Sequence, residues 1–172
     1  MASLMENLID VLNKECEEYE SLLKLSEEKT PVIVSGDLDQ LARITDEEQL
    51  IVSKINSLDK KREENFKDIA NVINKDVKTL QLGDLVDILS ARPEEQQRLA
   101  KVHDRLRTVV YAVRKVNEKN RELIKNALEM VEFNLNMLQA MKTAPETANY
   151  NRGAFNTGMQ MGVGKAGFDA KQ

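Results

Sequence analysis

The sequence predicts an all-α protein: an elongated antiparallel helical bundle or coiled coil of three long helices, with a short connecting helix and a flexible C-terminal tail. Apolar residues recur every three or four positions over long stretches, which is the period of an amphipathic helix. Aromatic residues make up only 4% of the 172 residues and charged residues 31%, a balance typical of long helices. The helical domain is expected over residues 1–142 and the tail over residues 143–172.

The longest helix is expected over residues 93–141, and the helices around residues 3–29 and 37–74 are expected to pack antiparallel along it. No Gly or Pro interrupts it after Pro93, which suits a first helical turn because its missing N–H is not needed there. About 50 residues at 1.5 Å each make a rod of about 75 Å, which cannot bury its apolar stripe alone. The stripe has heptad spacing at Leu99, Val102, Leu106, Val109, Val113 and Val116, and after Asn120 it continues at Ile124, Leu128, Val131, Leu135 and Leu138.

The first helix is expected over residues 3–29, where apolar residues lie on one face. Thr30 and Pro31 are expected to end it, because the residue before a proline is pushed out of the α region. Residues 32–34 are short and apolar, and they are expected to form an extended connection at the end of the bundle.

A second helix is expected over residues 37–74, with an apolar stripe like that of the longest helix. The polar residues Glu48 and Arg62 interrupt this stripe, and their side chains are expected to extend to the edge of the bundle. The apolar rhythm then stops, and Asp84 is expected to cap a short helix over residues 85–90 that joins the two long helices.

The composition argues against several classes of protein. The formal net charge is −4 and no basic face stands out, whereas a nucleic-acid-binding protein usually carries one. No stretch approaches about 18 apolar residues, so no membrane insertion is expected, and no signal peptide is visible. The lone Cys16 cannot form an internal disulfide, which fits a reducing cytoplasm.

No catalytic, cofactor or metal site is expected. His103 is the only histidine, and Ala100 lies three residues before it, so the Glu-x-x-His pair of a di-iron bundle is absent. We expect His103 to be a partly exposed residue beside the apolar stripe and Cys16 to be a small core residue. These residues cannot form a metal-ligand cluster, and we expect no enzymatic activity.

Asn120 takes a position within the apolar stripe of the longest helix. A buried asparagine there costs stability but fixes the register and the number of partners. The alternative is a tolerated polar residue at a loosely packed point, and the sequence leaves both open. If Asn120 is buried, replacing it by leucine is expected to raise stability and to loosen the register.

The tail differs in kind from the rest of the chain. It holds five of the seven glycines and shows almost no periodicity, so it is not expected to form a packed core alone. It nevertheless carries apolar side chains that a plain spacer does not need. Such anchors on a flexible segment favour folding that is coupled to binding, and they are Tyr150, Phe155, Met159, Met161 and Phe168.

Two helices carry motifs that resemble those of a known family. The second helix has Gly36-Asp37-Leu38, Leu41, Thr45, Glu47-Glu48, Leu50-Ile51, Ile55, Leu58 and Arg62, and the longest helix has Asn117, Asn120, Leu123, Ile124 and Leu128. Together these motifs resemble the FlgN family of flagellar export chaperones. The resemblance covers about residues 1–141 and continues into the tail.

The resemblance implies a small, acidic, helical protein of the cytoplasm with no membrane insertion. Such a protein binds unassembled flagellar hook-associated proteins of the hook–filament junction, prevents their premature association and delivers them to the flagellar type III export apparatus. The resemblance also implies contacts with components of the export gate or of the export ATPase, and it places client binding toward the C-terminal part of the chain.

The residues expected to bind a client lie at the end of the longest helix and in the tail. Beyond Ile124 this helix is apolar on more than one face, and the alternative is that the first helix covers the extra apolar residues. Flexible methionine side chains suit a surface that accepts several clients. The expected binding residues are Leu128, Val131, Leu135, Leu138, Met141, Tyr150, Phe155, Met159 and Phe168, with Met130, Phe133 and Met137 beside the stripe.

A structural coiled-coil protein or adaptor that self-assembles through its apolar stripes is the competing interpretation. Size and charge fit both functions, and a homo-oligomer is compatible with both. The apolar tail favours the chaperone, because self-assembly through helices does not need aromatic side chains spaced along a flexible segment.

Overall fold

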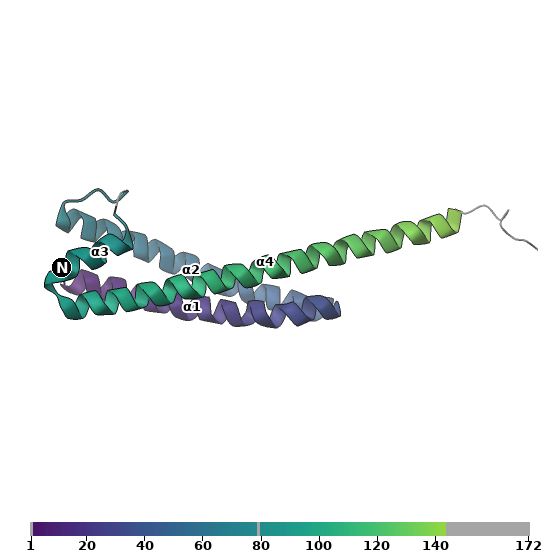
Figure 1. Cartoon of the computed structure of the whole chain (residues 1–172), viewed down its shortest axis with the longest axis horizontal. Coiled ribbons are helices and arrows are strands. Elements are labelled where there is room, and N and C mark those ends of the chain that lie inside the picture. The colour runs from purple at the N-terminus through teal and green to yellow at the C-terminus, as the bar shows by residue number, and fades with distance from the viewer. Residues whose placement is uncertain (1, 79, 144–172) are drawn as a thin grey trace, which may run out of the picture. The chain divides into compact units, whose positions relative to one another are not determined.

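The computed structural model describes residues 2–78 and 80–143, and within these residues it contains helices and no strand. This confirms the predicted all-α class, with three long helices and a short connecting helix. In chain order the elements are α1 (Ala2–Ser35), α2 (Leu38–Ile73), α3 (Leu82–Ile88), the 3-10 turn η1 (Leu89–Ala91) and α4 (Pro93–Thr143) (Figure 1). None of the helices in the described part of the chain has an apolar run long enough to cross a membrane.

The chain divides into two units, residues 1–128 and residues 129–172, and each is described by itself. The first unit contains α1, α2, α3 and most of α4. The described part of the second unit is the last stretch of α4, up to Thr143. The predicted boundary between a helical domain and a tail at residue 142 stays a prediction, because residues 144–172 lie outside the described part.

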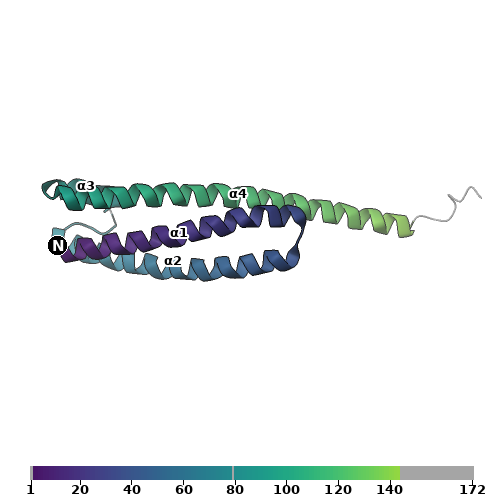
Figure 2. The same ribbon diagram turned by 90° about the horizontal axis from the view of Figure 1, so that it is seen from below.

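In the first unit the three long helices pack in a bundle whose directions follow from cross-helix contacts. Chain neighbours α1 and α2 are antiparallel, as Figure 2 shows. In contrast, α1 and α4 run in the same direction, because Arg98 contacts Glu6 whereas Arg105 contacts Glu20. The predicted antiparallel packing of the first helix along the longest helix is therefore wrong. The parallel pair is a geometric consequence of three helices in up-down-up order, in which only consecutive helices are antiparallel.

The core of this unit is built from the predicted apolar stripes. The stripe of α4 is buried from Leu99 to Val113, and it faces the fully buried Leu8 and Leu12 of α1. The short helix α3 contributes Leu85 to the same core, so it closes one end of the bundle. Each fully buried leucine contributes about 2 kcal/mol of transfer free energy, which makes these stripes the main stabilising term. A second cluster takes one residue from each long helix: Leu22, Ile55 and Val113.

The predicted end of the first helix at residue 29 is wrong, because α1 continues through Pro31 to Ser35. A proline within a helix removes one hydrogen bond and crowds the carbonyl one turn earlier. The next two residues, Val32 and Ile33, are buried, so packing offsets that loss and residues 32–34 are helical rather than extended. The helix ends at Ser35, and Gly36 follows it with a φ of 71°, a left-handed conformation that favours glycine.

The second helix begins and ends close to its predicted limits. Asp37 caps its start, since its carboxylate accepts a hydrogen bond from the backbone N–H of Gln40 at 3.0 Å. The predicted short helix is displaced, because α3 begins at Leu82 rather than at residue 85. Asp84 therefore lies inside the first turn of α3 and is not the cap. Its carboxylate reaches back to accept from the backbone N–H of Gln81 at 2.7 Å.

Candidate protein-binding surface

The last stretch of α4 exposes a concentration of large apolar side chains. Seven such residues occur between residues 130 and 141, and their exposed fractions lie between 49% and 69%. Isolated exposed apolar residues are ordinary, whereas a contiguous set of this kind marks an interaction surface. The seven are Met130, Val131, Phe133, Leu135, Met137, Leu138 and Met141.

The helical period divides these residues into two faces. Val131, Leu135 and Leu138 point to one side, and we call this set the aliphatic face. The other four residues form the methionine face, and its centre lies about 120° around the helix axis from that of the aliphatic face, at 100° per residue. The methionine face consists of Met130, Phe133, Met137 and Met141.

Polar residues separate the two faces on both sides. Asn134 lies in the narrower gap between them, and the wider gap holds five polar residues. All of these polar residues are exposed. The surface therefore has two apolar faces, and the wider gap consists of Glu129, Glu132, Asn136, Gln139 and Thr143, with Ala140 at its edge.

The structure leaves the described members of the predicted binding set exposed. Leu128 is exposed at the end of the first unit, and Val131, Leu135, Leu138 and Met141 are exposed in the second. The apolar residues that sequence reasoning placed beside the stripe are exposed as well, rather than covered. Four predicted binding residues of the tail lie outside the described residues: Tyr150, Phe155, Met159 and Phe168.

The other predicted positions, Asn117, Asn120, Leu123 and Ile124, lie in the first unit. Asn120 is buried, Asn117 is exposed, and Leu123 and Ile124 are half-buried. Asn117, Asn120 and Ile124 line a surface groove of about 360 Å³ that all three long helices border. Lys29 and Glu48 also line this groove, so polar side chains from all three long helices meet there.

Asn120 is held by two hydrogen bonds to α1. Its amide Nδ2 donates to the carbonyl oxygen of Ser26 at 2.7 Å, and its Oδ1 accepts from the hydroxyl of Thr30 at 2.6 Å. Both polar atoms of the buried amide are thus satisfied, which a loosely packed polar residue would not achieve. The structure thus shows a buried, hydrogen-bonded Asn120, and its role in fixing the register stays a prediction.

Glu48 belongs to the same polar layer, and the prediction that it extends to the edge of the bundle is wrong. It accepts hydrogen bonds from the hydroxyl of Ser26 at 3.1 Å and from the ammonium of Lys29 at 2.7 Å. Both members of the Glu48–Lys29 pair are mostly buried. Ser26 therefore connects α2 with α4, because its hydroxyl contacts Glu48 while its carbonyl contacts Asn120.

A second polar layer surrounds Glu15 of α1, whose side chain is 1% exposed. Arg62 of α2 donates to Oε2 of Glu15 at 3.2 Å and also pairs with Asp59. A third of the Arg62 side chain remains exposed, so it extends toward the edge as predicted while its guanidinium reaches inward. Burial raises the pKa of the Glu15 carboxyl, Arg62 acts to lower it, and Asp59 acts to raise it.

Sequence reasoning missed these two polar layers because it examined each helix separately. One signal was available in the sequence. Polar residues interrupt the apolar stripes at Glu48, Arg62 and Asn120, and α1 carries Glu15 and Ser26 among its own apolar positions. Polar positions on facing stripes predict partners for one another, since a buried polar group needs a hydrogen bond.

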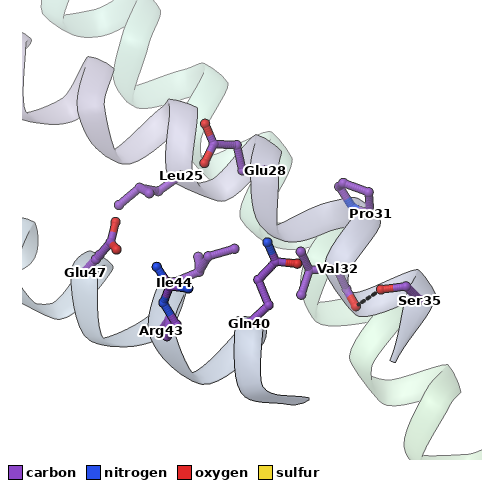
Figure 3. A pocket seen from close by; sticks show the side chains of 9 residues that line it. All are labelled: Leu25, Glu28, Pro31, Val32, Ser35, Gln40, Arg43, Ile44 and Glu47. Carbon is purple, nitrogen blue, oxygen red and sulfur yellow. Dashed lines mark hydrogen bonds between the residues drawn. The ribbon is translucent and has the colours of Figure 1, made fainter. Parts of the chain in front are cut away.

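Another groove lies between the end of α1 and the start of α2, with a volume of about 610 Å³ (Figure 3). Its apolar residues are Leu25, Val32 and Ile44. Charged groups from both helices border them, namely Glu28 on one side and Arg43 and Glu47 on the other. Ser35 closes its own helical turn, as its hydroxyl donates to the carbonyl oxygen of Val32 at 3.0 Å. The groove is open and holds no arrangement of catalytic groups.

The chemistry-bearing residues are placed as predicted. Cys16 is a buried free thiol 3.8 Å from the carbonyl oxygen of Val102, and burial raises its pKa, which keeps it protonated and unreactive. His103 is half-buried beside the α4 stripe, 3.5 Å from the carboxylate of Asp104. Within residues 2–78 and 80–143 no three His, Cys, Asp or Glu residues form a group that could hold a metal ion.

Comparisons with known proteins identify relatives of the whole helical part. A family model described as FlgN protein matches residues 1–156. The uncharacterized protein YvyG of Bacillus subtilis (strain 168) is 26% identical over 144 residues, which is 84% of this chain and 83% of that protein. No solved structure matches the chain. The family match confirms the resemblance that was inferred from the helix motifs.

Proposed function

The chain belongs to the FlgN protein family, and we propose on that basis that it is a cytoplasmic export chaperone for flagellar hook-associated proteins. The family gives the coarser role, that of a flagellar export chaperone with no catalytic activity. The finer proposal is that the chain binds unassembled subunits of the hook–filament junction, prevents their premature association and delivers them to the type III export apparatus. Components of the export gate or of the export ATPase are the proposed acceptors.

The exposed apolar surface of α4 supports this proposal more than any other feature. A subunit that polymerises through amphipathic helices must have those helices covered before assembly. The aliphatic face and the methionine face together offer seven exposed apolar side chains on one helix. Burying a side chain of this size contributes about 1.5–3 kcal/mol, so several of them buried together offset the cost of association.

The rest of the molecule fits a binding module rather than an enzyme. The polar layers at Asn120 and Glu15 hold the helices of the first unit in one register. The methionines of the second unit have flexible, polarisable side chains, which suit clients that share helical character but differ in sequence. A buried free cysteine, Cys16, is compatible with a reducing cytoplasm.

The test is a calorimetric titration of the purified full-length chain with hook-associated proteins from the same cell, with sedimentation of each component alone. The proposal expects a saturable complex of defined stoichiometry and a chain that does not form large assemblies. Absence of binding to every hook-associated protein would refute it. A chain that sediments as filaments or large oligomers would instead support the competing interpretation, a self-assembling coiled-coil protein.

A further inference from the structure

The surface on the last stretch of α4 is wider than one partner helix can cover. From the outer edge of the methionine face to the outer edge of the aliphatic face, apolar side chains span about 200° of the helix circumference. An amphipathic partner helix covers a stripe of little more than about 100°. A partner helix centred on Leu135 therefore leaves Phe133 and Met137 exposed, because they point to the other side.

We propose that one client segment wraps around this part of α4 as two amphipathic helices, one on the aliphatic face and the other on the methionine face. This inference rests on the proposed function and adds the form of the ligand. The methionine face extends over about three turns and the aliphatic face over about two, with Asn134 between them on one side and the wider polar gap on the other, so each presents its own docking stripe.

The dimensions set the shortest client segment that can do this. Two helices packed against α4 at about 9.5 Å and about 120° apart have axes about 16 Å from each other, so they do not contact one another. Spanning that distance takes about 5 extended residues at about 3.3 Å each. The methionine face extends from Met130 to Met141, about 12 residues, and the aliphatic face from Val131 to Leu138, about 8 residues. The shortest antiparallel arrangement therefore needs about 25 client residues.

One client segment explains the two faces better than two independent partners. The second helix of a wrapped segment binds as part of the same molecule, at a high effective concentration, and so requires only moderate affinity of its own. The two client helices are then held on separate sides of α4, where neither can pair with the other. A segment in this state cannot form the helix pairs that polymerisation requires.

Three consecutive residues of α4 provide matched variants. Leu135→Glu places a charge on the aliphatic face, and Met137→Glu places one on the methionine face. Asn136→Glu places the same charge in the wider polar gap. All three side chains are exposed in the structure, so each variant is expected to keep the wild-type melting temperature. All three variants introduce the same charge on the same helix. Leu135 and Met137 each lie one residue from the control position Asn136 along that helix.

The measurement is calorimetric titration of these full-length variants with a hook-associated protein that binds the wild-type chain, followed by hydrogen exchange of the client in each complex. We expect L135E and M137E each to weaken binding at least tenfold, with N136E within about twofold of wild type. We also expect each weakened complex to lose protection in a different client segment. Terminal client fragments of about 15 residues should bind far more weakly than fragments of 30 or more.

Three results would overturn the two-helix inference while leaving the chaperone proposal intact. The first is weakening by only one of L135E and M137E. The second is loss of protection in the same client segment for both variants. The third is a wild-type dimer that M137E converts to a monomer without changing client affinity, which would assign the methionine face to a second copy of the chain. Failure of the wild-type chain to bind any hook-associated protein would instead refute the proposed function.

Discussion

Asn120 of α4 donates its side-chain amide to the backbone carbonyl of Ser26 in α1 at 2.7 Å, inside the bundle. Thr30, one turn further along α1, donates its hydroxyl to the carbonyl oxygen of the same amide. One side chain of α4 thus bonds both to the backbone and to a side chain of the parallel helix α1, and we predict that this contact fixes the register of the pair. Apolar packing alone tolerates sliding by one heptad, whereas this contact does not.

The Asn120 contact reverses the effect on stability that the sequence predicts for Asn120→Leu. We expect Asn120→Leu to lower the free energy of unfolding by about 1–2 kcal/mol, because it removes the two short hydrogen bonds of the amide and leaves the Thr30 hydroxyl only the longer bond to the Ser26 carbonyl oxygen at 3.4 Å. The measurement is urea unfolding followed by circular dichroism. Asn117→Leu, at an exposed position one turn earlier, is the matched control and should change stability by less than about 0.5 kcal/mol. Stabilisation by Asn120→Leu would show that the hydrogen bonds contribute little.

The raised pKa of Glu15 predicts a pH dependence of stability. Between the ordinary value of 4.5 and its higher value in the fold, the folded chain binds more protons at this group than the unfolded chain does. Stability therefore falls as pH rises through that interval, with about 1.4 kcal/mol for each unit of pKa shift. Glu15→Gln should remove this decline when unfolding free energies are measured from pH 4.5 upward.

The control for that series is Glu17→Gln, which changes the same charge at an exposed position on the same helix. It should leave the slope of stability against pH as in the wild type. Identical slopes for wild type and Glu15→Gln would mean that Glu15 is already ionised in the fold at pH 4.5. In that case Arg62 and its hydrogen bond outweigh burial.

The exposure of the second unit predicts that its apolar residues do not support the bundle. Leu135→Glu combined with Leu138→Glu should shift the melting temperature by less than about 2 °C, since neither side chain is buried. Binding of a hook-associated protein should fall strongly in the same variant. Leu106→Glu, in the buried part of the same stripe, should unfold the bundle instead. Equal melting curves for the two variants would contradict the division between core and surface.

Removal of residues 144–172 tests the part of the predicted binding site that lies outside the described residues. From its composition, the tail is expected to add few native contacts, so truncation should leave the melting temperature nearly unchanged. Client affinity should fall by about 1–3 kcal/mol, the value of one or two buried aromatic anchors. Equal affinities in calorimetry would exclude the tail from binding, and a large drop in melting temperature would show a structural role.

The sequence predicted the helices because the heptad spacing is a local property that each helix carries by itself. It predicted the wrong end for α1, since the effect of Pro31 is local but the burial of Val32 and Ile33 depends on the other helices. It placed Glu48 at the edge for the same reason, because the partners Ser26 and Lys29 lie on another helix.

The candidate surface shows the same limit of sequence reasoning. The apolar stripe of α4 reads alike at Leu106 and at Leu135, yet the first residue is buried and the second is exposed. Periodicity shows where a helix can be covered, and only the arrangement of the other helices decides where it is covered. Apolar residues beside the apolar stripe of α4, such as Met130 and Phe133, were the one signal in the sequence that a second apolar face exists.

The proline inside α1 makes the last turn of that helix easier to open than its middle. Pro31 has no N–H to donate to the carbonyl of Glu27, so the turn beyond it depends on the packing of Val32 and Ile33 and on the Gly36 N–H. Opening this turn requires less free energy than opening the middle of the bundle. Backbone amides between residues 32 and 36 should therefore exchange with solvent earlier than those around Leu12, and a protease should cut at this hairpin before it cuts α1 around Leu12.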